Sequence, residues 1–297
     1  MTKKLLFVIN RGSGRKTKKQ DQIFKLINDF CNKHALEFEI YKTTGKNDPD
    51  NIKKIIADFN PQSVIAVGGD GTVNIVGSLI LNSGISLGII PMGSANGLAK
   101  DLRIPLNPMQ ALEVIRDNQI HAIDTLSINE NYCFHISDLG YNAGIVRRFA
   151  SSSIRGRILY IWFGLIEFFT LKPFHYLLKY DGQEIEGDAF MIIVTNVNRL
   201  GTNVNINPLG ENDDGYFEIC IFKPFHKLKS FGILYRLLNN SIFKSKYNLV
   251  VHCREANINN IENTSFHIDG DPIQLPKIIQ VKILPKALKV IVPLERI

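Results

Sequence analysis

Between Leu5 and Asp117 the chain repeats one pattern of apolar and polar positions four times. A short run suited to a strand is followed by a polar, glycine-containing loop and then by apolar residues at helical spacing. The predicted strands are Leu5–Ile9, Glu37–Tyr41, Ser63–Val67 and Ile85–Ile90, and the predicted helices are Lys18–His34, Pro49–Phe59, Thr72–Leu81, a short one ending near Leu102, and Met109–Asp117. Successive strand–loop–helix units indicate a parallel sheet with helices on its faces.

From Asp124 onward short alternating segments dominate, separated by turn residues such as Asp181-Gly182 and Asp269-Gly270. The predicted strands here are Thr125–Asn129, Tyr132–Ser137, Tyr176–Tyr180, Phe190–Thr195, Tyr216–Phe222, Asn248–Cys253, Ser265–Ile268, Gln280–Leu284 and Leu288–Val292, interrupted by helices at Arg155–Leu171 and Lys227–Asn239. This pattern indicates an antiparallel β domain. We therefore expect an α/β domain over residues 1–122 and a β-rich domain over residues 123–297.

The composition indicates the kind of partner and the redox compartment. A length of 297 residues, 45% of them hydrophobic, suits two domains with ample core. The net charge of +7 favours an acidic partner, which could be a nucleotide, a nucleic acid or an anionic membrane surface. The four cysteines are scattered without a C-x-x-C pair, which favours a reduced, cytoplasmic setting over a disulfide framework or a zinc site.

Two apolar segments bear on export and membrane insertion. Leu5–Ile9 is too short for the apolar region of a signal peptide. Ile158–Leu171 is shorter than a membrane span and contains Glu167. We therefore expect no transmembrane segment.

The stretch from Gly68 to Asn74 reads Gly-Gly-Asp-Gly-Thr-Val-Asn and follows an apolar run directly. Three glycines in four positions allow positive φ angles and leave no Cβ to obstruct a ligand. Exposed N–H groups before a helix can cradle an anion. The stretch lacks the Gly-Lys-Ser/Thr of a Walker A loop, and Asn74 stands where a dinucleotide fingerprint has its third glycine. The alternative interpretation is a tight turn with an incidental aspartate.

Four polar loops fall at the carboxyl ends of the four predicted parallel strands. They are Asn10–Gly14, Thr43–Asp48, Gly68–Thr72 and Gly93–Asn96. Ligands of such sheets bind beyond the carboxyl ends of the strands. The coincidence of four loops predicts a phosphate-bearing ligand there.

Two acidic turns stand out in the second half. Asn207–Tyr216 contains Asp213-Asp214-Gly215, and such carboxylate-rich turns either bind a hard divalent cation or are plain surface turns. His267–Pro272 predicts a hairpin with an Asp-Gly turn, in which Asp271 is either a general base or a solvated turn residue.

Together these stretches resemble the diacylglycerol kinase catalytic family, which includes soluble bacterial lipid kinases and the related sphingosine and ceramide kinases. Asn10–Gly14 resembles its Asn-Pro-x-Ser-Gly loop, and Gly68–Asn74 matches its Gly-Gly-Asp-Gly-Thr signature. The other matching stretches are Pro91–Asn96, Asp138–Ala143, Asp213–Gly215 and Asp269–Asp271. Gly-Gly-Asp-Gly alone also occurs in NAD kinases and phosphofructokinases, but six stretches in the family's order are specific.

The resemblance implies a Rossmann-like, parallel-sheet nucleotide-binding α/β domain and then an antiparallel β-sandwich-like domain, whose last strand could return to the first domain. It implies ATP contacts at Asn10, Arg11, Gly12, Ser13, Gly14, Thr43 (with Thr44 as the near alternative), Gly68, Gly69, Asp70, Gly71, Thr72, Val73, Asn74 and Ser94. Magnesium would be held by Asp214 and by the main-chain oxygens of Glu211 and Tyr216. Asp271 would be the catalytic base, and Asp70 would organise the metal and phosphate network.

The function expected from this resemblance is an ATP- and Mg²⁺-dependent transfer of a phosphoryl group to a diacylglycerol-like or other long-chain lipid alcohol. The partners would be ATP and a lipid at the membrane surface, not a nucleic acid, and the protein would be cytoplasmic and bind membranes peripherally; monomer and homodimer are both open. Four arginines beside the apolar segment 158–171 could dock it on an anionic bilayer, namely Arg147, Arg148, Arg155 and Arg157, although such a segment is more often ordinary core.

Two alternatives remain. One is a soluble-metabolite kinase similar to an NAD kinase. The other is a nucleotide-binding regulatory protein without catalysis, suggested by the departures from the family pattern at positions 75, 142 and 271. Ile75 and Asp271 stand where many members have glutamate, and Gly97 and Asn142 where many have aspartate.

Overall fold

The computed structural model describes residues 3–10, 18–152, 157–197, 199–200, 204–205, 207, 210–226, 229, 232–233, 235–236, 239–260, 262, 264–274 and 277–294. The chain divides into two compact units. Unit 1 comprises Met1–Ile123 together with Lys286–Ile297, and unit 2 comprises Asp124–Pro285.

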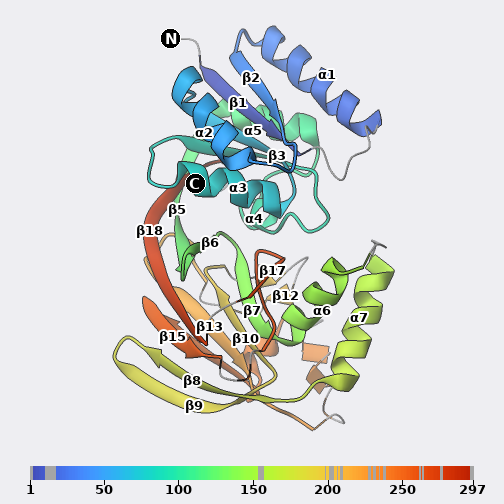
Figure 1. Ribbon diagram of the computed structural model, residues 1–297, viewed down its shortest axis with the longest axis vertical. Helices are drawn as coiled ribbons and strands as arrows, with labels where there is room; N and C mark the ends of the chain where they lie inside the picture. Colours follow the sequence, from blue (N-terminus) through green and yellow to red (C-terminus); the bar gives the residue numbers. More distant parts are fainter. Residues whose placement is uncertain are drawn as a thin grey trace. The chain divides into compact units, whose positions relative to one another are not determined.

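Unit 1 is built on parallel strands in the order β2-β1-β3-β4 (Figure 1). The strands are β1 (Lys4–Ile9), β2 (Glu37–Lys42), β3 (Ser63–Gly68) and β4 (Ser86–Pro91), and the helices are α1 (Lys18–Lys33), α2 (Asp48–Phe59), α3 (Asp70–Ile80), α4 (Gly97–Asp101) and α5 (Pro108–Asp117). Every residue of β3 and β4 is buried, as expected for central strands covered on both faces. Residues Lys289 and Val290 of β18 (Ile278–Val292) pair with β4 in parallel.

Unit 2 contains an antiparallel sheet in the order β14-β13-β10-β7-β16-β17. Its strands are β7 (Ile136–Gly140), β10 (Met191–Thr195), β13 (Phe217–Phe222), β14 (Asn248–Cys253), β16 (Phe266–Ile268) and β17 (Asp271–Ile273). A second antiparallel group consists of β8 (Phe174–Tyr180), β9 (Gln183–Ala189), β15 (Glu255–Asn259) and β18, with β5 (Gln119–Ile128) on β18 and β6 (Asn131–Cys133) on β5. Buried side chains from both groups form one core, which makes this unit sandwich-like.

The remaining elements of unit 2 are helices α6 (Tyr141–Ala150) and α7 (Arg157–Thr170), which pack side by side (Figure 1), the short η2 (Ile242–Lys244), and the strand pair β11 (Arg199–Leu200) and β12 (Val204–Asn205). All four cysteines are described, buried and without a disulfide.

The predicted fold class, a parallel-sheet α/β domain followed by an antiparallel β domain, is confirmed, but several boundaries differ. The predicted strands Gln280–Leu284 and Leu288–Val292 are one strand, β18, because pairing resumes beyond Pro285 and the positive φ of Lys286. The predicted strand Tyr132–Ser137 is two, β6 and β7. Strands β9 and β15 and helix α6 were not predicted; β9 and β15 are rich in polar residues and lack a clear apolar run. The predicted helix Lys227–Asn239 lies largely outside the described residues.

Candidate active site

The four loops of unit 1 leave the sheet at one edge, as the order of the strands requires. Neighbouring strand ends are tied by backbone hydrogen bonds: Asn10 N–H to the Val67 oxygen at 3.1 Å, and Thr43 N–H to the Ile9 oxygen at 2.9 Å. Met92 N–H bonds to the Gly68 oxygen at 2.8 Å. The loops that begin at Asn10, Thr43, Gly69 and Met92 therefore start side by side.

The glycines of the Gly-Gly-Asp-Gly stretch allow neighbouring chain segments to pack closely and do not have unusual backbone angles. None of Gly68, Gly69 and Gly71 has a positive φ, so that part of the sequence interpretation is wrong. A Cβ on Gly68 would lie 2.8 Å from the Cβ of Thr72, and a Cβ on Gly93 would lie 2.5 Å from the Cα of Gly69. The two loops touch backbone to backbone, which only glycine permits.

Asp70 joins the third loop to the fourth. Its Oδ1 accepts a hydrogen bond of 2.7 Å from the N–H of Gly97 at the start of α4. Asn96 braces the same loop by accepting from Gly93 N–H at 2.8 Å and donating to the Gly93 oxygen at 3.0 Å. Asp70 thus has a structural function in addition to its predicted role with metal and phosphate.

The other residues predicted to contact ATP differ in whether their side chains are buried or exposed. Helix α3 starts at Asp70, two residues before the prediction, because the N–H groups of Thr72 and Val73 bond to the Gly69 oxygen. The side chains of Thr72 and Val73 are buried, so only their main chain can face a ligand. Asn74 is half-buried, whereas Asn10 and Ser94 are exposed. Arg11, Gly12, Ser13 and Gly14 lie outside the described residues.

The second loop is organised by the buried carboxylate of Asp48. It accepts from Thr44 N–H at 2.8 Å, from Gly45 N–H at 2.7 Å and from the Tyr41 hydroxyl at 2.7 Å. Burial alone would raise the pKa of Asp48, but these hydrogen bonds outweigh it and leave the pKa below its usual value. Thr43, whose side chain is 9% exposed, and Thr44, whose hydroxyl bonds to Asp48 at 3.0 Å, therefore stand in a rigid loop.

In unit 2 the predicted Asp-Gly hairpin is confirmed. Asp269 and Gly270 have φ angles of 49° and 90°, and β16 pairs with β17 so that Ile268 faces Asp271. Asp271 is exposed and is the first residue of β17, the edge strand of the sheet. The Asp269 carboxylate accepts from the N–H groups of residues 134, 135 and 136 at 2.9 to 3.1 Å.

A buried polar cluster behind this hairpin was not predicted. His267 Nε2 lies 2.6 Å from Oδ2 of Asp138, and the amide of Asn142 donates to the same oxygen. Burial would lower the pKa of His267, but the charge and hydrogen bond of Asp138 outweigh it and raise that pKa. Both residues lie in stretches that the sequence marked, yet only the pairing of β16 with β7 sets His267 opposite Asp138.

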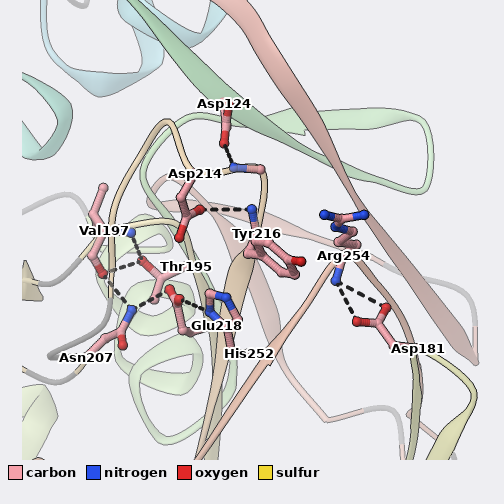
Figure 2. Close-up of polar contacts among 11 residues, drawn as sticks. Asp124, Asp181, Thr195, Val197, Asn207, Asp214, Tyr216, Glu218, His252 and Arg254 are labelled. Carbon is pink, nitrogen blue, oxygen red and sulfur yellow. Dashed lines mark hydrogen bonds and ion pairs between the residues drawn. The ribbon is translucent and has the colours of Figure 1, made fainter.

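The acidic turn before β13 presents main-chain oxygens to a single side chain. With its amide nitrogen facing them, Asn196 donates to the oxygens of Glu211 at 3.1 Å and of Tyr216 at 2.7 Å. Asp214 accepts from Tyr216 N–H at 2.9 Å, and buried Asp124 accepts from Gly215 N–H at 2.6 Å (Figure 2). The donor set is therefore made of oxygens, as a hard cation requires. No three acidic, histidine or cysteine side chains converge on a metal site in the described part of the chain.

Beside this turn the Tyr216 ring lies between the His252 ring and the Arg254 guanidinium (Figure 2). It stacks on the His252 ring with centroids 4.4 Å apart, and the Arg254 guanidinium lies 4.5 Å from its centroid. His252 Nδ1 lies 2.7 Å from the Glu218 carboxylate, whose burial raises its pKa despite this contact. Sequence reasoning did not find this cluster, because its members come from two strands, β13 and β14, from the turn before β13 and from the bend after β14.

Helix α7 has two unlike faces. Its inner side meets α6, where Glu167 pairs with Arg148 at 2.7 Å and the Tyr141 hydroxyl donates to the Gly164 oxygen. Elsewhere on α7 four large apolar side chains are exposed to solvent: Ile158 (85%), Trp162 (58%), Leu165 (49%) and Phe169 (68%). Arg155 and the Arg157 side chain lie outside the described residues. Over the described helices, none is long and apolar enough to cross a membrane.

Comparison with known proteins covers nearly the whole chain. Residues 4–128 match the family model "Diacylglycerol kinase catalytic domain", and residues 136–292 match "YegS C-terminal NAD kinase beta sandwich-like domain". The chain belongs to the lipid kinase family that combines these two domains.

Curated relatives carry corresponding names. A diacylglycerol kinase of Bacillus subtilis (strain 168) is 24% identical over 274 residues, covering 91% of this chain and 90% of that protein. A Klebsiella pneumoniae (strain 342) protein named "Probable lipid kinase YegS-like" is 25% identical over 294 residues, covering 97% and 95%. The crystal structure of a diacylglycerol kinase from Bacillus anthracis str. Sterne matches with a TM-score of 0.72 at 19% identity, covering 99% and 98% of the two chains. This last likeness shows the fold.

One departure from the diacylglycerol kinase pattern has a physical reason here. Asn142 stands where aspartate is usual, and its amide donates to the carboxylate of Asp138, where a second carboxylate would repel. Gly97 also stands where aspartate is usual; its N–H donates to Asp70, a bond that an aspartate could make equally well, and nothing in the structure explains the glycine.

We expect Asp48→Asn to lower the free energy of unfolding at pH 7 by about 1–3 kcal/mol, because its amide group cannot accept from Gly45. The folded-state pKa of Asp48 is depressed, so the carboxylate stabilises the fold above its unfolded pKa of about 3.9. That contribution is lost as the pH falls through the folded value. Melting temperatures of variant and parent should therefore differ most above about pH 5 and converge on acidification.

The control is Asp50→Asn, which changes an exposed carboxylate in the same first turn of α2 and should have little effect. A difference between Asp48→Asn and the parent that stays constant down to about pH 3 would contradict the assignment.

Proposed function

We propose that this chain is an ATP- and magnesium-dependent kinase that phosphorylates the hydroxyl of a diacylglycerol-like or other long-chain lipid alcohol. The observation that carries the proposal is the set of four loops at one edge of the parallel sheet, with Gly69 and Gly93 in backbone contact. Family membership and the names of the relatives support the lipid as acceptor.

The nucleotide would be bound mainly by main-chain groups. The phosphates would lie at the N-terminus of α3, where Gly69 and Gly71 have no Cβ atoms to obstruct an anion. Thr72 and Val73 would contribute their main chain, and Asn10, Thr43, Asn74 and Ser94 their side chains. Asp70, anchored by Gly97, would orient the charged groups around the phosphates.

Magnesium would be held by Asp214 with the main-chain oxygens of Glu211 and Tyr216. These two oxygens already converge on one side chain, the amide of Asn196, which can present either its nitrogen or its oxygen. A set of carbonyl oxygens with one or two carboxylates is typical of Mg²⁺. Bound there, the ion would supply positive charge beside the turn that leads into β13.

Asp271 would act as the base. The hydroxyl oxygen of the lipid attacks the γ-phosphorus, the bond to the β-phosphate oxygen breaks, and ADP leaves with that bonding pair. The hydroxyl proton goes to the Asp271 carboxylate. Exposure of Asp271 at a sheet edge suits a group that must meet a substrate.

We expect purified protein, given ATP, Mg²⁺ and a total lipid extract, to yield a phosphorylated lipid detectable by mass spectrometry. Asp271→Asn should lower the rate about 100-fold or more, because the proton acceptor is lost, and should leave ATP affinity unchanged. Asp188→Asn is the matched control, since Asp188 is also an exposed strand aspartate of unit 2.

Three results would redirect the proposal. Full activity of Asp271→Asn would exclude Asp271 as the base. Phosphorylation of NAD and of no lipid would favour the soluble-metabolite alternative. ATP binding without any product would favour the regulatory alternative.

We expect Asp214→Ala to raise the Mg²⁺ concentration for half-maximal activity about 10-fold or more, since a charged ligand is removed. Manganese binding measured by calorimetry should weaken in parallel. Asp213→Ala, which removes the neighbouring exposed carboxylate, is the control and should change neither value. Equal metal requirements in the two variants would show that Asp214 is not a ligand.

The protein would reach its lipid substrate through the exposed face of α7. At about 100° per residue, Ile158, Trp162, Leu165 and Phe169 lie within an arc of about 60°, and Glu167 lies on the opposite side. Their exposure, 49% to 85%, excludes core packing for this face. A helix with such an apolar stripe suits the plane of a bilayer surface.

The charge beside this stripe favours anionic lipids. A cavity of about 400 Å³ is lined by Arg147, Arg148, Ser151, Ser152 and Phe163. Arg148 is paired with Glu167, whereas Arg147 is exposed. Two guanidinium groups and two hydroxyls are suitable partners for the phosphate of a lipid headgroup.

We expect the fluorescence of Trp162, the single tryptophan of the chain, to shift to shorter wavelength with phosphatidylglycerol-containing vesicles. Leu165→Glu should abolish the shift and vesicle co-sedimentation, because a charge enters the apolar stripe. Leu106→Glu is the matched control, as Leu106 is 53% exposed but lies in unit 1. Loss of binding in both variants, or in neither, would contradict docking through α7.

A further inference from the structure

Two ionisable side chains are almost completely buried beside the hairpin that carries Asp271. Asp138 is 0% and His267 is 2% exposed, and they come from the neighbouring strands β7 and β16. Asp138 Oδ2 accepts from both His267 and Asn142, while its Oδ1 has no hydrogen-bond partner among the described residues.

The second ring nitrogen of His267 faces the hairpin turn. The N–H of Gly270 lies 3.3 Å from His267 Nδ1, and a backbone N–H can only donate. In the neutral tautomer with its proton on Nε2, Nδ1 accepts from Gly270 and Nε2 donates to Asp138. The imidazole thus connects the buried carboxylate of β7 to the residue directly before Asp271.

The turn is consequently held at both of its central residues. Asp269 is fixed by three backbone N–H groups of residues 134–136, and Gly270 is fixed by His267. Both turn residues have positive φ angles, so the chain direction into β17 is strictly defined. Asp271 is exposed, but it follows a turn whose backbone is anchored in the sheet.

The burial of this pair is not explained by stability. Burying a carboxylate costs free energy, and a buried pair seldom repays more than apolar side chains of the same volume would. Asp138 Oδ1 adds a further cost as a buried oxygen without a hydrogen-bond partner in the described part of the chain. A function for the pair is therefore the better explanation.

We propose that Asp138 and His267 are positioning residues that fix the carboxylate of Asp271 for proton abstraction, an inference that rests on the proposed kinase function. The side chain of Asp271 is one methylene shorter than the glutamate that many family members have at this position. A shorter side chain has less freedom to find its target, so its backbone must be placed accurately. Displacement by about 1 Å can cost a factor of about 100 in rate.

The test uses two substitutions at one position. The side-chain amide nitrogen of His267→Gln can replace Nε2 and keep the bond to Asp138, but the variant loses the acceptor for Gly270. The side-chain oxygen of His267→Asn can replace Nδ1 and keep that acceptor, but the variant loses the bond to Asp138. We expect kcat to fall about 10- to 100-fold in His267→Gln with the KM for ATP unchanged, and to fall less in His267→Asn. The melting temperature should fall more in His267→Asn.

A structural role alone would make kcat and melting temperature change together, so the opposite order of the two variants is diagnostic. A double-mutant cycle adds a second readout: His267→Gln should cause no further loss in the Asp271→Asn background. The control is His175→Gln, because His175 also contacts an aspartate, Asp188 at 3.1 Å, but on the exposed hairpin β8–β9.

Unchanged kcat in His267→Gln, or additive losses in the cycle, would overturn the proposal while leaving Asp271 as the base. Full activity of Asp271→Asn would overturn both. If neither variant at position 267 folds, the ¹⁵N chemical shifts of His267 in the parent protein decide. An acceptor Nδ1 and a protonated Nε2 support the anchored turn, and a protonated Nδ1 overturns it.

Discussion

The parallel hydrogen-bond register of β2, β1, β3 and β4 is the constraint on which the site of unit 1 depends. Ile9 is level with Lys42 on one side and Val67 on the other, and Gly68 is level with Pro91. Each strand therefore ends in the same row, and each loop leaves the sheet at the same height. The contact of Gly69 with Gly93 is a consequence of this register, since both residues follow paired strand ends. A side chain at either position would separate these loops, which form the proposed nucleotide site.

In unit 2 the same principle operates through antiparallel pairing. Strand β16 lies against β7 so that His267 faces Asp138, and it continues into β17 through a turn that Asp269 and His267 hold. Four aspartates of the two units fall into two groups, those held by several hydrogen bonds and those exposed to solvent. Asp48 and Asp269 are saturated by backbone N–H groups and fix loops. Asp214 and Asp271 are exposed, at the places where a metal and a substrate would meet the chain.

The two sides of helix α7 have different environments. Its inner side is specified by close packing, because a Cβ on Gly144 would collide with Glu167, the partner of Arg148. Its outer side exposes bulky apolar side chains to solvent, which is unfavourable in water. The proposed docking on a bilayer would use this surface, and Arg147 and Arg148 line a cavity beside it.

The sequence by itself determined the fold class and the positions of the loops that follow the parallel strands, because strand–loop–helix periodicity and glycine placement are local properties. It also determined the family, because six short stretches occur in a fixed order. It misjudged why Gly68 and Gly69 are glycines. A Cβ on Gly68 would meet Thr72 in the first turn of α3, and a Cβ on Gly69 would meet Gly93, which is close only because the loops after β3 and β4 come together. It likewise could not separate the apolar stripe of α7 from core, because identical spacing serves both. The pairing of Asp138 with His267, 129 residues apart, was decided by the register of β7 and β16 alone. Strand register depends on the packing of the whole sheet, and no local pattern encodes it.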